Sequence, residues 1–486
     1  MSTALRSEAH PGCADSQDSR GLRAVPATAD AGAKPTWYDS MHAEELLNMK
    51  LTKGSFCWFA MASGWSLAAA HAEAPKAATC DETGFVSIFD GKTGEGWSIY
   101  HDKGQPIKPD AWVIEDGAIL NKCMGYWYRY EAEQLENFVL RMQFKVSEGA
   151  NSGIVLKSKA EGVPWQTGFE VQILDDHGKE PNKNSTGSIY DVLTPMYNES
   201  KPVGEWNDIE ITCDGKLVKV VVNGLKVIDV DFSEFTKPVG KFKRFNLAYN
   251  DLPARGYLAL QDHGRPVWFR NIRVKKLDKP SPPPVRNTSE EGFVPLLNAT
   301  HSEGWAVAHD NGKTPFTLKE GVLRCNGTWG PWYRYEASEL SDIVLRMDVR
   351  TTQEGRSTSG NSGIVLRASK DGDPPYSGFE VQVLAEHDKQ PHKHCMGAIY
   401  DMVVPMLDAT KPIGEWNEVE ITIDGLLCKV ILNGRKIIDT DFSKLTTKRG
   451  KFGFPYAELP RSGYLCLQDH GDVVEFRNIR VKKLNR

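Results

Sequence analysis

The most regular pattern along the chain is a two-residue alternation of apolar and polar side chains. In the segment FVLRMQFKV, residues 138–146, the apolar residues share one face, and Arg141, Gln143 and Lys145 share the other. Residues 343–349, IVLRMDV, repeat the alternation. Successive side chains of a β-strand point to opposite faces, so both segments are predicted to be half-buried strands.

Turn-forming residues join such strands in pairs. Asn223 and Gly224 separate two apolar runs in VKVVVNGLKVIDVDF, and Asn433 and Gly434 do the same later in the chain. An Asn-Gly pair favours a type I′ hairpin because both turn residues need positive φ. Strand patterns recur at short intervals and no long amphipathic helix intervenes. We therefore expect an all-β fold: two tandem antiparallel sandwiches of the jelly-roll type.

The chain is internally duplicated. NSGIVLKSK at Asn151 returns as NSGIVLRAS at Asn361, and KPVGEWNDIEIT at Lys201 returns as KPIGEWNEVEIT at Lys411. Both offsets are 210 residues (361 minus 151 and 411 minus 201). Solenoid repeats have periods of roughly 20–50 residues, so this spacing indicates duplication of a whole domain. We expect a first domain over 81–277, a proline-rich, semi-rigid linker over 278–291 and a second domain over 292–484.

The N-terminal region has the features of a targeting sequence. Residues 49–74 combine a lysine-containing start, a short apolar run and a final small-x-small triplet, which predicts a signal peptide and a secreted or periplasmic protein. Residues 1–48 are then a disordered leader or a mis-assigned start. The alternative is a core helix in a small N-terminal domain. No longer apolar run follows, so we expect no membrane span in the mature chain.

Composition and charge narrow the class of protein. The chain has 486 residues, 25% of them charged, and a formal net charge of -5. No basic stripe is present, so nucleic acid is not an expected partner. None of the nine cysteines recurs at the matched position of the other copy. We therefore expect buried free thiols rather than a disulfide framework, with a single bridge as the open alternative.

Several separated blocks carry a family resemblance. They are GFVSIFDGKTGEGW at Gly84, GFEVQILDD at Gly168, TGSIYD at Thr186 and LQDHG at Leu260, and each has a counterpart in the second copy. With these blocks, in this order, the chain resembles the 3-keto-disaccharide hydrolase domain family, twice. The resemblance implies a concanavalin A-like jelly roll, secretion or an envelope location, and hydrolysis of glycosides oxidised at C3. We expect a carbohydrate substrate and no cofactor.

The block GFEVQIL offers polar groups on one face of a strand. Its Phe, Val and Ile point to one side, and Glu170 and Gln172 point to the other. On the concave face of a curved sandwich they would form a hydrogen-bonding floor for sugar hydroxyls, with Lys157 from a neighbouring strand. The alternative is a solvated strand face. The matching residues of the second copy are Arg367, Glu380 and Gln382.

Two further acids follow the strand. Glu170 and Asp175 echo the spaced carboxylates of laminarinase-type jelly-roll glycosidases, in which such pairs act as acid and base or nucleophile. Asp176 lies beside them. The second copy carries Ala385 and Glu386 at these two positions, so it has lost one carboxylate of any such pair.

Histidines and aromatic residues complete the candidate site. His263 and His470, in the two LQDHG blocks, are candidate general bases, or alternatively pack at a strand edge. His394 precedes the second AIYD block in a loop rich in His and Cys; a metal there is conceivable, but we expect none. The aromatic candidates for stacking on sugars, for which core packing is the alternative, are Trp127, Tyr128, Tyr190, Trp332, Tyr333 and Tyr400.

Three functions remain open. As a hydrolase, the protein would use Glu170 or His263 as base, Lys157 to hold the substrate and Asp175 or Asp176 to assist departure. The second copy would use the residues Arg367, Glu380, Glu386, His394 and His470. A tandem carbohydrate-binding protein without catalysis is the second hypothesis, since the fold does not fix the function. One active copy joined to one binding copy is the third. The oligomeric state stays open.

Overall fold

The computed structural model describes residues 81–101, 106–122, 125–450 and 453–484. The predicted leader, 1–48, and signal peptide, 49–74, lie outside the described residues and stay predictions. Within the described part of the chain, no helix is long and apolar enough to cross a membrane.

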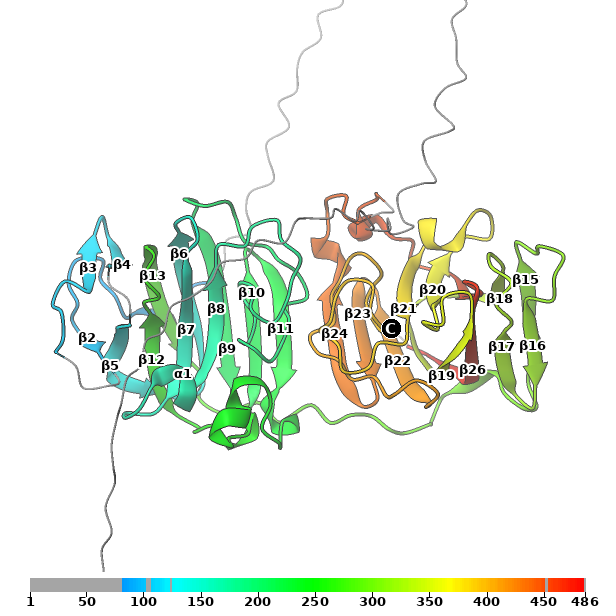
Figure 1. Cartoon of the computed structure of the whole chain (residues 1–486), viewed down its shortest axis with the longest axis horizontal. Coiled ribbons are helices and arrows are strands. Elements are labelled where there is room, and N and C mark those ends of the chain that lie inside the picture. The colour runs from blue at the N-terminus through cyan, green and yellow to red at the C-terminus, as the bar shows by residue number, and fades with distance from the viewer. Residues whose placement is uncertain (1–80, 102–105, 123–124, 451–452, 485–486) are drawn as a thin grey trace, which may run out of the picture. The chain divides into compact units, whose positions relative to one another are not determined.

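The first copy is a sandwich of two antiparallel sheets (Figure 1). One has eight strands in the order β11-β10-β9-β6-β13-β4-β3, with β1 paired to β13. The other has five, in the order β2-β5-β12-β7-β8. The bounds are β1 Val86–Ser87, β2 Trp97–Tyr100, β3 Trp112–Glu115, β4 Ala118–Asn121, β5 Trp127–Leu135, β6 Phe138–Val146, β7 Asn151–Ser158, β8 Phe169–Leu174, β9 Asn207–Asp214, β10 Leu217–Val222, β11 Leu225–Asp231, β12 Gly256–Gln261 and β13 Val267–Lys276. Short helical segments are α1 Pro164–Thr167 and the 3₁₀ turns η1 Phe232–Glu234, η2 Gly240–Phe245 and η3 Tyr249–Asp251.

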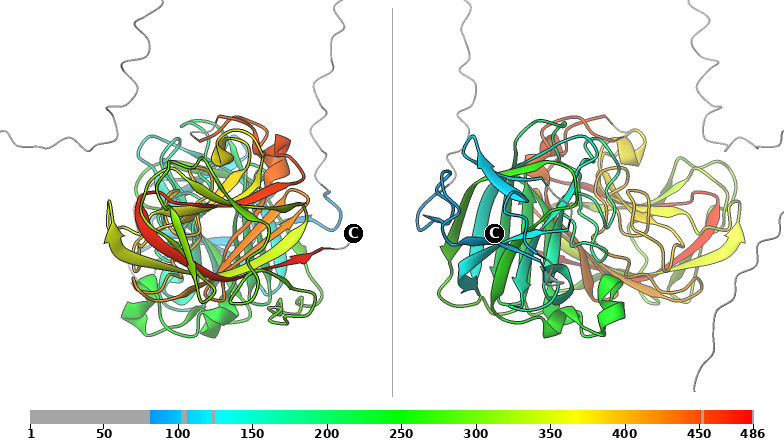
Figure 2. Two further views of the ribbon diagram at one scale, coloured as in Figure 1. Left: turned by 90° about the vertical axis from the view of Figure 1, so that its right-hand side faces the viewer. Right: turned by 60° about the vertical axis from the view of Figure 1, so that its left-hand side comes forward.

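The second copy repeats this topology. Its eight-stranded sheet runs β16-β17-β26-β19-β22-β23-β24, with β14 on β26, and its five-stranded sheet runs β15-β18-β25-β20-β21. Strand β26, red in Figure 2, bends strongly along its length. The bounds are β14 Val294–Leu297, β15 Trp305–Ala308, β16 Phe316–Lys319, β17 Val322–Cys325, β18 Trp332–Leu340, β19 Ile343–Gly355, β20 Ser362–Ala368, β21 Phe379–Val383, β22 Asn417–Asp424, β23 Leu427–Leu432, β24 Arg435–Asp441, β25 Gly463–Gln468 and β26 Asp472–Lys483. The 3₁₀ turns are η4 Pro374–Tyr376, η5 Phe442–Lys444 and η6 Tyr456–Glu458. The predicted all-β fold of two tandem sandwiches is confirmed.

The alternation in the sequence places the core between the sheets. In β6 every second residue from Phe138 is buried, and the residues between are half-buried. The hairpins β10–β11 and β23–β24 turn at the two Asn-Gly pairs. Their φ angles are 47° and 87° at Asn223 and Gly224, and 49° and 83° at Asn433 and Gly434. Both predicted turns therefore have the positive φ values that favour Asn and Gly.

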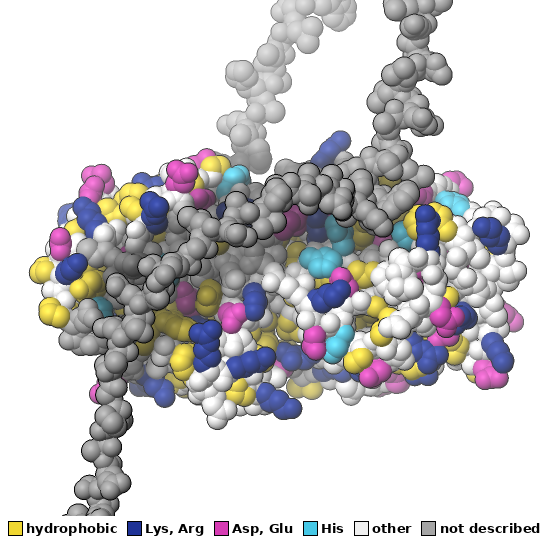
Figure 3. Space-filling view, viewed as in Figure 1, with side chains coloured by type: hydrophobic (Ala, Val, Ile, Leu, Met, Phe, Trp, Pro, Cys, Tyr) yellow, Lys and Arg dark blue, Asp and Glu magenta, His cyan; other side chains and the backbone are white. Residues whose placement is uncertain are grey.

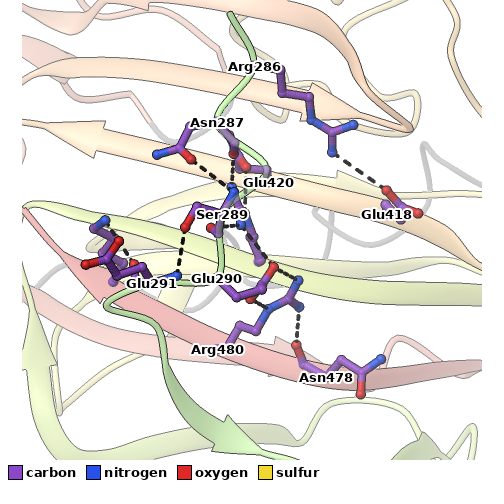
Figure 4. A network of polar contacts seen from close by, with 11 residues as sticks. Arg286, Asn287, Ser289, Glu290, Glu291, Glu418, Glu420, Asn478 and Arg480 are labelled. Carbon is purple, nitrogen blue, oxygen red and sulfur yellow. Dashed lines mark hydrogen bonds and ion pairs between the residues drawn. The ribbon is translucent and has the colours of Figure 1, made fainter.

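The linker contains no helix or strand from residue 278 to 290. Its last residues are held on the eight-stranded sheet of the second copy (Figure 4). Glu290 accepts hydrogen bonds from Arg346 at 3.0 Å and from Arg480 at 2.6 and 2.9 Å, while Arg286 pairs with Glu418 at 3.7 Å. The last residues of the linker are thus fixed to the second sandwich by side-chain contacts.

Charge and cysteine placement agree with the sequence-based expectations. Lys and Arg side chains intermingle with Asp and Glu on the visible face, without a stripe of one sign (Figure 3). The cysteines among the described residues are buried free thiols, which confirms that expectation for them: Cys213, Cys325, Cys395, Cys428 and Cys466.

Candidate functional site

A pocket opens on the five-stranded sheet of the first copy, over β8. Its volume is about 330 Å³, and pockets for small ligands span about 300–1,000 Å³. The apolar residues of β8, including Phe169 and Val171, are fully buried in the core, whereas Glu170 and Gln172 line the pocket. The pocket's aromatic and imidazole residues are His101, Trp127, Trp165, Tyr190 and His263. Its other polar residues include Asn151, Gln261 and Asp262.

Glu170 is held in a gap made by a glycine. A Cβ at Gly153, on the neighbouring strand β7, would lie 2.2 Å from Oε1 of Glu170. The backbone N–H of Tyr190 donates to the Glu170 carbonyl at 3.0 Å. The side chain of Glu170 is therefore folded over β7, and only 3% of the residue is exposed.

Gln172 is oriented by its neighbour on β7. Its Nε2 donates to Oδ1 of Asn151 at 2.8 Å, which commits one of the two N–H groups of its side-chain amide. This contact fixes which end of the amide is the carbonyl. Gln172 and Asn151 together offer donors and acceptors of the kind that bind sugar hydroxyls.

Lys241, in η2, is not among the residues that line the pocket, but it faces the Glu170 carboxyl. Its Nζ lies 3.9 Å from Oε2 of Glu170, is buried, and has no hydrogen-bond partner among the described residues. Burial raises the pKa of Glu170 to about 7, against the opposing effect of the Lys241 charge. Burial likewise lowers the pKa of Lys241 to about 8, against the charges of Glu170 and Asp191. A carboxyl group and an amine with such shifted pKa values exchange protons near neutral pH, as acid–base catalysis requires.

Lys157 does not lie on the face of β7 that the two-residue alternation of the strand predicts. It has a φ of 55°, and the register of β7 against β12 shifts beside it, between Val155 and Ser158. This bulge reverses the side chain, because an extra residue breaks the two-residue period. Nζ of Lys157 donates to the Gly215 carbonyl at 3.0 Å. Lys157 is therefore not brought together with Glu170 in the pocket.

The predicted acids after β8 also lie outside the pocket lining. Asp175 accepts a hydrogen bond from the Gly149 N–H at 2.9 Å. Asp176 is buried, and it accepts from the N–H and hydroxyl of Thr186 at 2.9 and 2.8 Å. Both carboxylates therefore stabilise neighbouring loops through these hydrogen bonds. Tyr128 is likewise a core residue, stacked between two tryptophans of the core.

The second copy rebuilds the same arrangement around Glu380. A Cβ at Gly363 would lie 2.0 Å from Oε1 of Glu380, and the Tyr400 N–H donates to the Glu380 carbonyl at 2.9 Å. Nε2 of Gln382 donates to Asn361 at 2.9 Å. The buried carboxylate, the oriented amide and the tyrosine are therefore common to both copies.

The remaining candidates of the second copy are spread more widely. Arg367, at a φ of 58°, donates to the Gly425 carbonyl at 2.7 Å and so repeats the bulge seen at Lys157. Glu386 contacts His392, with 2.7 Å between Oε2 and Nε2. His394 lies close to the site, because its Nε2 is 3.1 Å from Asp401 and its ring centroid is 4.8 Å from that of Tyr400.

The aromatic candidates of the second copy also differ in their placement. Trp332 is 2% exposed and packs in a small cluster, and Tyr333 stacks on Trp305 with centroids 5.0 Å apart. His470 lies against the half-exposed Trp329, with centroids 4.4 Å apart. These contacts make Tyr333 a packing residue and place an aromatic pair beside the second LQDHG block.

Several residues of the site were not predicted from the sequence, among them Lys241, Gly153, Trp165, Asn151 and His101. The repeated NSGI block and the repeated GKF at Gly240 and Gly450 were available as signals. Lys451, the counterpart of Lys241, lies outside the described residues. Trp165 has no matching aromatic residue, since Pro375 replaces it, so repetition could not have revealed it.

One group of side chains among the described residues has metal-ligand spacing. Ligand atoms of His387, Asp388 and Asp408 lie within 4.8 Å of one another. His387 and Asp388 are exposed, and the Asp388 N–H donates to the Asp408 carboxylate at 2.7 Å. No chemical step is assigned to this cluster.

The comparisons with known proteins agree with the duplication of the chain. The model of the 3-keto-alpha-glucoside-1,2-lyase-like domain matches residues 84–275 and again 292–482. A protein of Bacteroides thetaiotaomicron named 3-keto-disaccharide hydrolase is 33% identical over 238 residues, covering 41% of this chain and 80% of its own. Two solved structures of candidate glycosyl hydrolases from Parabacteroides distasonis are 26% and 29% identical, with TM-scores of 0.34 and 0.35. Each covers 40% of this chain, and 94% and 99% of its own.

The fold and site define a duplicated all-β protein with a carboxylate-centred pocket. The chain belongs to the 3-keto-alpha-glucoside-1,2-lyase-like domain family, in two tandem copies. It is a glycoside hydrolase-like enzyme.

Proposed function

We propose that the protein cleaves 3-keto-glycosides, 3-keto-disaccharides among them, by elimination followed by addition of water. The observation that carries the proposal is the buried Glu170 carboxyl, lining a pocket of sugar-binding residues and paired with Lys241. The family description and the name of the Bacteroides relative support the same chemistry.

The reaction follows from the ketone. A carbonyl at C3 acidifies the proton on C2, and Glu170 takes that proton while the electron pair moves onto the C3 oxygen. The enolate then reforms the ketone and expels the C1–O electron pair, so the glycosidic oxygen leaves and takes up a proton. Water adds to the resulting C1=C2 bond, with hydroxide bonding to C1 and a proton returning to C2.

The residues of the pocket divide these tasks. Once Glu170 is protonated, Lys241 has lost its counter-charge and favours negative charge on the substrate. His263 lines the same pocket and is the proton donor to the leaving oxygen. Gln172, held by Asn151, and Trp127 bind and orient the sugar. Asp175, Asp176 and Lys157 take no chemical step in this scheme.

Turnover of 3-keto-trehalose in deuterated water tests the proposal. We expect solvent deuterium at C2 of the product, no cleavage of unoxidised trehalose, and a loss of more than about 100-fold in kcat/KM for the Glu170→Gln, Glu380→Gln double variant. Each single variant serves as the matched control for the other copy. Cleavage without deuterium at C2, or equal cleavage of trehalose, would contradict the mechanism.

Carbohydrate binding without catalysis is the competing function, and an exposed tryptophan beside His470 favours it for the second copy. Trp329 is 48% exposed, with the Arg356 guanidinium 4.4 Å from its ring centroid. A tryptophan offers a flat apolar ring and a polar N–H, which suit the face of a sugar and its hydroxyls. Turnover by the Glu380→Gln variant, together with retention but no turnover of the 3-keto-sugar by the Glu170→Gln variant, would assign catalysis to the first copy and leave the second copy to bind.

The proposal includes export. A lysine-containing start, an apolar run and a small-x-small triplet over residues 49–74 support a secreted or periplasmic protein. N-terminal sequencing of the secreted or periplasmic protein should find a start shortly after residue 74. A mature chain that begins before residue 49 would contradict it.

A further inference from the structure

The two copies meet through equivalent segments, within the compact unit formed by Cys80–Arg486. The Thr194 N–H donates to the Met406 carbonyl at 2.9 Å, and the Val404 N–H donates to the Met196 carbonyl at 3.1 Å. Thr194 corresponds in sequence to Val404, and Met196 to Met406. Each copy therefore presents the same segment to the other, as the subunits of a two-fold symmetric dimer do.

The outermost strands of the two large sheets are covered at the same place. β11 and β24 are edge strands, and edge strands carry unpaired N–H groups. The Asp229 N–H of β11 contacts Sδ of Met406 at 3.3 Å, and the Asp439 N–H of β24 contacts Sδ of Met196 at 3.5 Å. Each copy thus satisfies a backbone donor of the other.

Four charges cross the interface as a closed ring. Lys226 contacts Asp229 in its own copy at 2.9 Å and Asp439 in the other at 2.7 Å. Lys436 contacts Asp439 at 3.2 Å and Asp229 at 2.7 Å. Burial opposes ionisation, yet the two aspartates raise the pKa of Lys226 and the two lysines lower the pKa of Asp229. Lys226 and Asp229 are therefore favoured in their charged forms, and each of the four groups contacts two groups of opposite sign.

The interface segment is continuous with the wall of the first site. Ile189 bridges to Val171 of β8 and also to Leu193, the residue before Thr194. Tyr190, which lines the pocket, follows Ile189 directly. The second copy has the matching bridges from Ile399. A displacement of the paired segments would therefore move the tyrosine at each site.

We propose that the protein operates as a fused dimer, in which this interface rather than the linker holds the copies together and positions Tyr190 and Tyr400 at the two sites. Only the activity readout below rests on the proposed function. Tyr190 lines the first pocket, and Tyr400 donates its backbone N–H to the Glu380 carbonyl. Thr194, Met196 and Met406 are positioning residues that act through these two tyrosines.

Cutting the linker tests the first half of the proposal. Val285 is 91% exposed, so a protease recognition sequence inserted between Pro284 and Val285 will be accessible. After cleavage the two halves should co-elute in size-exclusion chromatography at the volume of the uncut variant. Separation of the halves at micromolar protein would overturn the proposal.

Charge reversal tests the second half. Lys226→Glu with Lys436→Glu places four acids in the ring, and adding Asp229→Lys with Asp439→Lys restores opposite charges. In a Glu380→Gln background the two lysine substitutions should lower kcat/KM of the first site by about tenfold or more. Adding the two aspartate substitutions should restore it. Lys92→Glu with Lys319→Glu, at exposed positions, is the matched control and should leave kcat/KM unchanged.

Hydrogen exchange separates failure of this proposal from failure of the proposed function. Faster exchange in residues 188–197 of the charge-reversed variant supports positioning even if no 3-keto-sugar is turned over. Unchanged exchange together with unchanged kcat/KM would overturn the positioning role while leaving the elimination chemistry intact.

Discussion

At the scale of single residues, a missing side chain is what makes room for the site. Gly153 has no Cβ, and the Glu170 carboxylate occupies the space that a Cβ would need. The same relation holds for Gly363 and Glu380. The glycine of the repeated NSGI block is thus part of the functional arrangement, although it carries no chemical group.

Gly153→Ala should therefore impair the first site more than it impairs folding. The new Cβ would push aside a flexible side chain rather than backbone, so kcat/KM should fall by about 100-fold, as expected for a displaced catalytic group. Kinetics in the Glu380→Gln background and a melting curve are the measurements. Gly363→Ala in that background is the control and should change neither the kinetics of the first site nor its pH profile. Full activity of Gly153→Ala would contradict this account.

The pH dependence belongs to the same pair of residues. Glu170 must be deprotonated to act as base, so kcat/KM should rise through its raised pKa of about 7. Lys241 must stay protonated, so kcat/KM should fall above its lowered pKa of about 8. The result is a narrow bell-shaped profile.

Lys241→Met removes the cation that opposes the rise in the Glu170 pKa. The rising limb of the pH profile, which reports Glu170, should therefore move to higher pH. The falling limb, which reports Lys241, should vanish. A profile of kcat/KM against pH in the Glu380→Gln background measures both. A rising limb that stays in place would show that Lys241 does not act on Glu170.

At the scale of elements, a bulge decides which lysine serves the pocket. Strand alternation predicts Lys157 on the same face of β7 as Asn151, but the bulge turns Lys157 toward the Gly215 carbonyl. Lys241 arrives instead from η2, a 3₁₀ turn far along the chain. Gly256 lies against the bulge, where a Cβ would be 2.4 Å from the Lys157 backbone.

Lys157→Met separates the two placements. We expect kcat/KM to stay within about twofold of the parent, because the ammonium group lies outside the pocket and effects of separate sites are independent. Both variants are measured in the Glu380→Gln background, where Lys241→Met, the comparison variant, should reduce kcat/KM clearly. An equal loss for both variants would place Lys157 back at the substrate.

At the scale of the whole molecule, duplication has preserved the centre of the site and changed its rim. The buried glutamate, its glycine, the paired amides and the tyrosine recur. Trp165 and Val163, which line the first pocket, become Pro375 and Asp373. The second copy thus has a proline ring in place of the indole of Trp165, and a carboxylate in place of the apolar side chain of Val163.

The two copies should therefore differ in the sugars that they prefer. Glu170→Gln leaves the second site and Glu380→Gln leaves the first, so each variant reports one copy. The ratio of kcat/KM for 3-keto-trehalose and 3-keto-cellobiose should differ between these variants by about fivefold or more, since loss of apolar contact is worth about 1–3 kcal/mol. Identical ratios would contradict a role for the rim.

Repetition made much of this predictable. Alternation in β6 and the two Asn-Gly turns predicted the sandwiches. The repeated GFEVQ block singled out Glu170 and Gln172, which line the pocket of the first copy, and their counterparts Glu380 and Gln382. The acids Asp175 and Asp176 could not be separated from Glu170, because sequence gives spacing but not hydrogen-bond partners. Lys157 was misplaced because a bulge leaves no mark in the alternation.

The sequence by itself determined the class of fold, the duplication and the strand that carries the glutamate, because these depend on local periodicity and on repeated blocks. Only the tertiary structure decided that Lys241 is the partner of Glu170 and that the two copies exchange equivalent contacts. Both depend on residues distant in the chain that meet after the sheets have packed, and burial, which shifts their pKa values, exists only then.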